Sequence, residues 1–185
     1  MEAARAAGIW HLVDISIVGV DRVPYRYYQT KLAAERLIQA SGLPWTILSA
    51  TQFHQLVLLV ARGLARLPLV PVPAGTSFQP IDAAEVADRL TALATGSPAG
   101  RVPDLGGPQI RTASDLAGAY LQAAGRRRPV LAVHLPGAAF ASYRQGGHLA
   151  PDHAVGHRTW EQFLAEHVGH LGRAPAGGTT AGRRM

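Results

Sequence analysis

The chain has 185 residues, of which 48% are hydrophobic and 16% are charged, and it contains no cysteine. This length suits one domain with a substantial core, and the composition excludes a chain that is disordered throughout. Without cysteine, disulfide bonds, thiolate catalysis and cysteine-bound metals are excluded, and a reducing location is favoured. No apolar run has the length of a membrane span and no secretory signal is evident, so the expected location is the cytoplasm.

The formal net charge of +6 raises the question of nucleic-acid binding. Three of these charges come from Arg173, Arg183 and Arg184 near the C-terminus, where no acidic residue accompanies them. The other basic cluster, residues 126–128, follows an expected helix end, where cations complement the helix dipole. Because no basic stripe with interleaved aromatic residues is present, a nucleic acid is not expected as a partner. Without an apolar run of membrane length, a membrane is not expected either.

Strand-like and helix-like segments alternate along the chain, which is typical of a parallel sheet with crossover helices. Hydrophobic periodicity and capping residues predict helices at 2–7, 25–41, 51–66, 83–94, 112–124, 136–143 and 159–168. Runs of β-branched and apolar residues predict strands at 9–18, 45–48, 67–73, 78–81, 101–105 and 129–135. The predicted fold class is α/β, with residues 1–171 folded and residues 172–185 a disordered tail.

Two of the expected helices carry more specific signals. Asp82 is the expected N-cap of the helix at 83–94, and Glu85 is placed to complete a variant of the capping box. In the helix at 51–66, an apolar stripe is expected to face the core. Its members are Phe53, Leu56, Val57, Val60 and Leu64.

The most informative chemical pattern is Tyr27-x-x-x-Lys31 at the start of the helix at 25–41, which follows the first strand. Residues four apart lie on one face of a helix, with Cβ atoms about 5–6 Å apart. A nearby ammonium group favours the phenolate form of a tyrosine, so such a pair suits proton transfer in carbonyl and alcohol chemistry. The same spacing also occurs on solvated helix faces, and the surrounding sequence decides between the two interpretations.

Three segments occur in the order GIWHLVDISIVGVD, YYQTKLAAERLIQASGLPWTILSATQFH and FQPIDAAEVADRLTAL. Together they resemble the atypical and extended short-chain dehydrogenase/reductase families, most closely the NmrA-like, NAD(P)H-binding branch. The later segment RVPDLGGPQIRTASDLAGAYLQAAG resembles the substrate-side part of the same proteins. The resemblance implies a Rossmann-like parallel sheet with crossover helices and a small C-terminal substrate-side region.

The resemblance also assigns roles to individual residues. Tyr27 matches the acid/base tyrosine, and Lys31 matches the lysine that lowers its pKa and contacts the nicotinamide ribose. Ser16 lies where the family's strand brings a hydroxyl group toward the substrate, and Ser49 stands where an arginine is common in relatives. The loop that the resemblance places beside the nicotinamide consists of Ala50, Thr51, Gln52 and Phe53.

The sequence departs from the family at the dinucleotide site. A Gly-rich turn between a first strand and a helix normally lets backbone amides approach the diphosphate, and no such turn is present. The chain is therefore expected to correspond to the C-terminal part of a longer oxidoreductase, N-terminally truncated, with weak or lost NAD(P) binding. An unpaired sheet edge would favour a homodimer or a complementing N-terminal segment as partner.

The expected function is that of an NAD(P)-dependent oxidoreductase acting on a small carbonyl compound or quinone, impaired by the lack of the diphosphate site. Two alternatives remain open: a non-enzymatic, NmrA-like dinucleotide-sensing regulator, and an inactive fragment. No metal site is expected, because the pairs His153/His157 and His167/His170 lack an acidic third ligand at zinc-like spacing.

Overall fold

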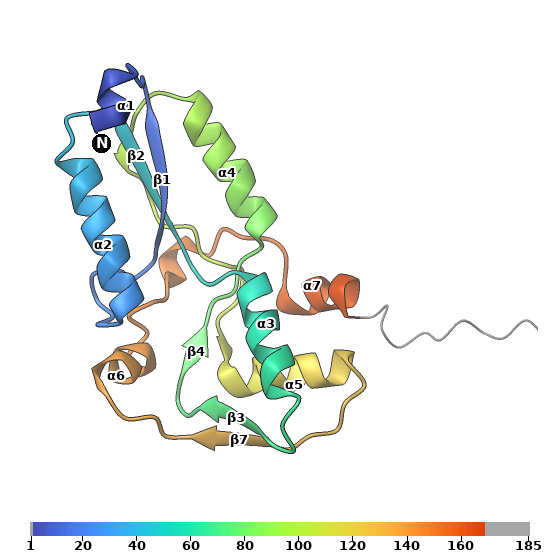
Figure 1. Cartoon of the computed structure of the whole chain (residues 1–185). Helices are drawn as coiled ribbons and strands as arrows, with labels where there is room; N and C mark the ends of the chain where they lie inside the picture. The colour runs from blue at the N-terminus through green and yellow to red at the C-terminus, as the bar shows by residue number, and fades with distance from the viewer. Residues whose placement is uncertain (1, 169–185) are drawn as a thin grey trace, which may run out of the picture.

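The computed structural model describes residues 2–168, so the tail predicted to be disordered lies outside the described residues. A three-stranded parallel sheet with the order β1-β2-β5 forms one half of the structure (Figure 1). Its strands are β1 (Leu12–Ile17), β2 (Trp45–Ala50) and β5 (Gly100–Arg101). Helices α2 (Arg26–Gln39) and α4 (Ala83–Thr95) pack against β1 and β2.

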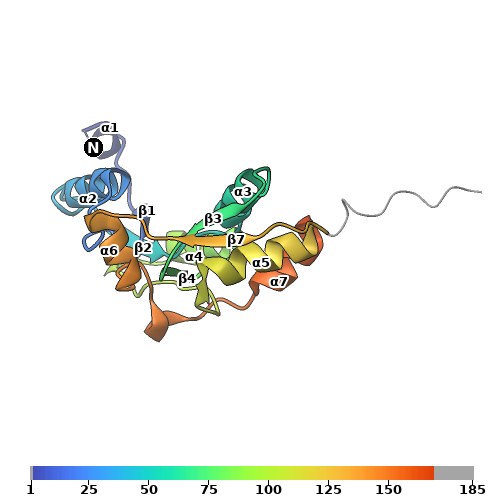
Figure 2. The ribbon, with the colours of Figure 1, turned by 90° about the horizontal axis from the view of Figure 1, so that it is seen from below.

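The other half consists mainly of helices and short strand pairs (Figures 1 and 2). Its helices are α3 (His54–Leu64), α5 (Ala113–Ala123), α6 (Ala138–Arg144) and α7 (Trp160–His167). Strands β3 (Val70–Pro73) and β7 (Val130–Val133) pair in parallel, and β4 (Ser77–Phe78) and β6 (Arg111–Thr112) pair antiparallel. The remaining short helices are α1 (Glu2–Ala6) and the 3-10 turn η1 (Pro151–His153).

The core of this second half lies between α3, α5, α7 and β3. Trp160 and Phe163 are fully buried from α7, and their rings stack with centroids 5.7 Å apart. His54, at the start of α3, stacks on the Phe163 ring at 5.0 Å. Aromatic burial on this scale makes α7 a structural part of the fold.

The α/β class and the Rossmann-like parallel sheet are confirmed, but the strands do not all join one sheet. They divide into three small sheets, and β3 pairs with β7 and with no other described strand. Pro71 and Pro73 explain why β3 has one partner, because their nitrogens face the side of β3 away from β7 and offer no N–H to a further strand there. No helix among residues 2–168 is long and apolar enough to cross a membrane.

The N-cap predicted for α4 is confirmed, since Asp82 Oδ1 accepts a hydrogen bond from the Ala84 amide at 2.9 Å. The predicted capping box is wrong. Glu85 Oε1 instead accepts from the backbone amides of His157 and Arg158, at 2.9 and 3.0 Å. The carboxylate therefore ties the segment before α7 to the start of α4, a contact between distant parts of the chain.

The apolar stripe predicted to face the core along α3 is wrong in part. Leu56 and Val60 are 55% and 52% exposed, whereas Leu58 and Ala61 are buried. Most of the stripe lines an apolar cavity, which leaves the outer parts of the Leu56 and Val60 side chains open to solvent. The periodicity correctly indicated a helix but not which of its faces the rest of the fold covers.

Candidate functional site

The predicted site residues come from neighbouring elements of the β1-β2-β5 sheet. β1 and β2 run parallel with Ser16 opposite Ser49 and Ile17 opposite Ala50, so their carboxyl ends lie at the same edge. The chain then crosses from β1 to the start of α2, which brings Tyr27 and Lys31 to the α2 side of this sheet. Carboxyl ends of parallel strands are where open α/β sheets bind ligands.

Tyr27 and Lys31 lie one turn apart on α2, as the spacing predicts. The Tyr27 side chain is exposed, and its residue retains 58% of its accessible surface. Lys31 Nζ lies 3.4 Å from Asp14 Oδ1 on β1, and both side chains are 22% exposed. Neither Tyr27 nor Lys31 lines the charged cavity beside the sheet, the apolar cavity beside α3 or the groove over α5 and α7.

The Ser16 side chain is almost fully buried, at 3% exposure. Its hydroxyl group has no hydrogen-bond partner among residues 2–168. Ser49, opposite it on β2, accepts a hydrogen bond from Arg101 Nη1 at 3.0 Å. Arg101 thus places a guanidinium group beside Ser49, the position at which the family resemblance leads one to expect an arginine.

The loop after β2 is fixed by hydrogen bonds to distant segments. Thr51 Oγ1 accepts from the Gly107 amide at 3.1 Å, and the amide of His54, which follows Phe53 at the start of α3, donates to the Ile81 carbonyl at 2.9 Å. Gln52 Oε1 accepts from the Gln79 amide at 3.3 Å, while Gln52 Nε2 donates to the His148 carbonyl at 3.5 Å. Among residues 50–53, only Gln52 lines one of the described cavities.

Sequence reasoning missed a buried aromatic cluster beside this loop. The Tyr28 and Tyr143 rings meet edge to face, with centroids 6.4 Å apart, and Tyr143 meets His148 at 4.4 Å. Burial raises the pKa of Tyr28 well above its ordinary value, and hydrogen bonding to Tyr143 raises it further, whereas that to Gln52 lowers it. Tyr28 was detectable as the neighbour of Tyr27 on the inward face of α2, but nothing in the sequence pointed to Tyr143.

His148 is expected to make the stability of the fold depend on pH. Its ring is fully buried, Nε2 lies 2.8 Å from the Ser77 carbonyl oxygen, and burial lowers the pKa to about 4 from 6.5. The unfolded chain therefore binds a proton more readily, so stability is complete above pH 6.5 and is lost as the pH falls toward 4. The loss reaches about 3 kcal/mol of unfolding free energy.

Urea denaturation at several pH values between 7 and 4 tests this expectation. His148→Gln should flatten the decline, because the remaining side chain does not take up the proton. His134→Gln changes an exposed histidine and serves as the matched control. A decline as steep in His148→Gln as in the unaltered protein would show that another group is responsible.

A charged cavity of about 410 Å³ lies beside the sheet on the α2 side. It is lined by Glu35, Ser49, Arg101 and Asp104 among others, and Arg101 forms an ion pair with the fully buried Glu35. Burial raises the pKa of Asp104. Glu35 Oε1 has no hydrogen-bond partner among residues 2–168. The ion pair of Arg101 with Glu35 Oε2 is therefore the contact that stabilises the charge of this buried carboxylate.

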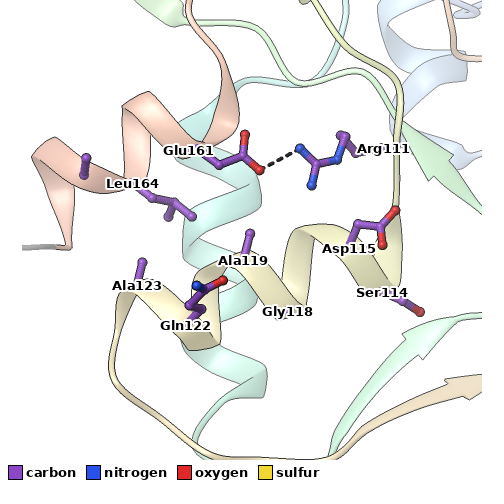
Figure 3. Close-up of a pocket in the computed structure, with 10 residues that line it drawn as sticks. Arg111, Ser114, Asp115, Gly118, Ala119, Gln122, Ala123, Glu161 and Leu164 are labelled. Atoms are coloured by element: carbon purple, nitrogen blue, oxygen red, sulfur yellow. Dashed lines mark hydrogen bonds and ion pairs between the residues drawn. The ribbon is translucent and has the colours of Figure 1, made fainter.

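The largest of the three described cavities, about 630 Å³, lies elsewhere, over α5 and α7 (Figure 3). It is an open groove lined by small residues such as Gly118, Ala119 and Ala123. The ion pair between Arg111 Nη1 and Glu161 Oε1, at 2.6 Å, spans it. None of the predicted site residues lines this groove, and α2 lies at the opposite end of the molecule in Figures 1 and 2.

The residues present fit one end of a nicotinamide dinucleotide better than the other. The Lys31 ammonium, the unpartnered hydroxyl of Ser16 and the side-chain amide of Gln52 in the loop after β2 are groups that can form hydrogen bonds with ribose hydroxyl groups. The glycines that follow β1 and β5 offer no diphosphate cradle. A Cβ at Gly19 would lie 2.0 Å from the Gly147 carbonyl oxygen, and one at Gly107 would lie 1.8 Å from that of Pro80. Both glycines therefore pack against the chain's own backbone, and neither offers an open turn to a phosphate group.

Among residues 2–168, no group of three or more acidic or histidine side chains is placed to hold a metal ion. Of the two histidine pairs considered in the sequence, the pair His167/His170 includes a residue, His170, that lies outside the described residues.

Comparison with solved structures shows a shared fold. An NADPH-dependent quinone oxidoreductase from Escherichia coli, complexed with NADPH, is 16% identical with a TM-score of 0.75, covering 89% of this chain and 68% of that chain. Triphenylmethane reductase from Citrobacter sp. is 18% identical with a TM-score of 0.69, covering 91% and 68%. A nucleoside-diphosphate-sugar epimerase from Staphylococcus aureus is 16% identical with a TM-score of 0.68, covering 88% and 67%.

Comparison of the sequence itself identifies the family. No curated protein matches the chain significantly. A family model described as NAD(P)H-binding matches residues 1–95, which run from α1 to the end of α4 and include all the predicted site residues. The family resemblance drawn from the sequence is therefore confirmed, and the chain belongs to the NAD(P)H-binding family, whose cofactor is NAD(P).

Proposed function

We propose that this protein is an NAD(P)-dependent oxidoreductase that acts on a small carbonyl compound or quinone. The observation that carries the proposal is the Tyr27–Lys31 pair, one turn apart on α2, in a chain that belongs to an NAD(P)H-binding family. The pair lies on the helix that follows β1, the side of the sheet on which Ser49 and Arg101 also meet.

Each residue has a proposed role. Reduced nicotinamide, when bound, supplies the hydride. Tyr27 gives a proton to the substrate oxygen, and the Lys31 ammonium stabilises the phenolate that remains. Ser16 is the proposed additional hydrogen-bond donor, since its hydroxyl has no partner among the described residues. The residues proposed to contact the nicotinamide end are Tyr27, Lys31, Ala50, Thr51, Gln52 and Phe53.

Lys31 is paired with Asp14, so its proposed contact with a ribose requires an exchange of partners. The separation of 3.4 Å is long for a charge-assisted hydrogen bond, which is normally about 2.7–2.9 Å. Both side chains also keep contact with solvent. A partly solvated, loosely made ion pair contributes little to stability, so the exchange costs little.

Hydride transfer is tested directly by adding NADPH and a quinone to the purified protein and following the loss of NADPH absorbance. The proposal predicts oxidation that depends on both the protein and the quinone. Binding of NADPH without oxidation, across quinone and carbonyl substrates, would contradict it.

Binding of NADPH without oxidation is the result that the alternative function predicts. A dinucleotide-sensing regulator would bind NAD(P)H without turning it over. One observation favours it: Tyr27 is exposed and lies outside the described cavities, so none of them encloses the proposed proton donor. The same assay therefore separates the two proposals, because they differ in turnover and agree in binding.

A partner is proposed at the free edge of the β1-β2-β5 sheet. Among the described strands β1 pairs only with β2, and Trp10, just before β1, is 64% exposed. A strand edge of this kind pairs readily with another strand. We expect either a homodimer or association with a complementing segment. Light scattering should show a species larger than the monomer or an aggregate, and a monodisperse monomer with a sharp, reversible melt would argue against both.

A further inference from the structure

A second cavity in the structure is apolar and lies away from the charged one. It has a volume of about 400 Å³, within the range of about 300–1,000 Å³ that is usual for small-molecule sites. Its walls come from α3, β3, β4, α5 and α6, so it lies in the half of the molecule that contains the two-stranded sheets (Figure 1).

The lining is apolar apart from one side chain. Leu116 and Ala117 of α5 and Val72 of β3 are buried beneath the cavity. Leu56 and Val60 of α3 line it while remaining more than half exposed, which places them where it opens to solvent. No charged residue lines it, so an ionic ligand would lose its hydration there without gaining a partner.

The one polar lining residue is Gln52, from the loop after β2. Its Nε2 reaches the His148 carbonyl only at 3.5 Å, beyond the 2.7–3.2 Å of an ordinary N–H···O hydrogen bond. A better acceptor inside the cavity can therefore take this hydrogen. Gln52 Oε1 is held by the Gln79 amide at 3.3 Å, which fixes the orientation of the side chain.

Gln52 also connects this cavity with the proposed active site. It belongs to the loop that leaves the carboxyl end of β2, at the edge of the sheet where the proposed active site lies. Tyr27 and Lys31 do not line this cavity, so a molecule held against Gln52 has to extend out of it along the loop after β2 to reach them.

We propose that the apolar cavity is the substrate site, and that it takes an uncharged apolar ring ketone or quinone whose carbonyl oxygen accepts a hydrogen bond from Gln52 Nε2. This inference rests on the proposed function and specifies its substrate class. The charged cavity around Glu35 and Arg101 does not suit such a molecule, because its buried polar groups would lose hydration without replacement.

Isothermal titration without cofactor measures this binding separately from turnover. The ligands are menadione, methylnaphthalene, which has a similar shape but no carbonyl, and a naphthoquinone sulfonate, which adds a negative charge. Menadione should bind about tenfold more tightly than methylnaphthalene, as one hydrogen bond of about 1.4 kcal/mol predicts. The sulfonate should bind more weakly than menadione.

Variants of α3 locate the site. Val57→Trp fills the cavity and should weaken menadione binding at least tenfold, whereas Leu59→Trp on the outer face, 68% exposed and outside the lining, should not. Val60→Trp narrows the opening without touching the core, so it serves if Val57→Trp fails to fold. Gln52→Leu should remove the preference for menadione over methylnaphthalene.

The outcomes separate this inference from the proposed function. Menadione binding that is unchanged in a folded Val57→Trp or Val60→Trp variant would overturn the assignment of the cavity. Equal binding of menadione and the sulfonate would overturn the substrate class. Binding that follows all these expectations without NADPH oxidation would leave the cavity assigned and contradict the oxidoreductase proposal alone.

Discussion

Tyr27→Phe is expected to lower kcat for NADPH-dependent reduction by about 100- to 10,000-fold, the usual contribution of a positioned acid or base. The substitution removes only the phenolic hydroxyl, from a side chain that is largely exposed, so folding should be unchanged. NADPH binding should fall much less than kcat, because Lys31 and the loop at residues 50–53 keep their proposed contacts with the nicotinamide end. The measurement is a steady-state comparison of kcat and KM with a quinone substrate.

Tyr25→Phe is the matched control for this experiment. Tyr25 precedes the same helix and is 51% exposed, close to the 58% of Tyr27, and it has no proposed role in the reaction. Its rate should equal that of the unaltered protein. A rate in Tyr27→Phe that equals that of the control would remove Tyr27 from the mechanism, whatever else the protein does with NADPH.

Arg101→Met is expected to lower the free energy of unfolding by about 3 kcal/mol. Glu35 is 1% exposed, and its described partner is Arg101, so the substitution leaves a buried carboxylate without a counter-charge. Breaking a buried ion pair in this way typically costs about 3–5 kcal/mol, and the lower end applies because the Arg101 side chain is 43% exposed. Urea denaturation at neutral pH measures the loss.

Two further variants show whether the loss comes from the buried charge. Glu35→Gln combined with Arg101→Met should recover much of the stability, because no unpaired charge remains. Arg111→Met breaks the more exposed ion pair with Glu161 and should cost only about 0–1 kcal/mol. If Arg101→Met costs no more than Arg111→Met, water reaches Glu35 and the pair is not a structural requirement.

Local signals allowed much of the secondary structure to be predicted. Asp82 before α4 and Thr159 before α7 are N-caps whose side chains accept hydrogen bonds from amides within the first turn, and such contacts depend only on nearby residues. The bounds of α2 and α5 likewise follow from local periodicity. These elements were predictable because neighbours along the chain determine them.

Contacts between distant residues could not be predicted in the same way. The Tyr28–Tyr143 and Glu85–Arg158 contacts join segments more than 70 positions apart, and no spacing rule connects them. For the same reason, the periodicity of α3 did not reveal that Leu56 would line a cavity open to solvent. The division of the strands into three sheets also depends on how these segments pack.

The candidate site shows the same division between local and distant information. The pairing of Tyr27 with Lys31 follows from helical spacing, but the ion pair of Lys31 with Asp14 depends on how α2 packs on β1. Ser16 was placed correctly on a strand, and its burial could only be seen once α2 and β2 were in position.

The most direct test of the proposed nicotinamide site is a calorimetric titration of the purified protein with NADPH. We expect weak but measurable binding that Lys31→Met weakens by at least about tenfold, since it removes the charge proposed to hold the ribose. Arg36→Met, which removes an exposed charge from the far end of the same helix, should have no such effect. No detectable binding, or equal losses in the two variants, would contradict the proposal that this end of α2 holds the cofactor.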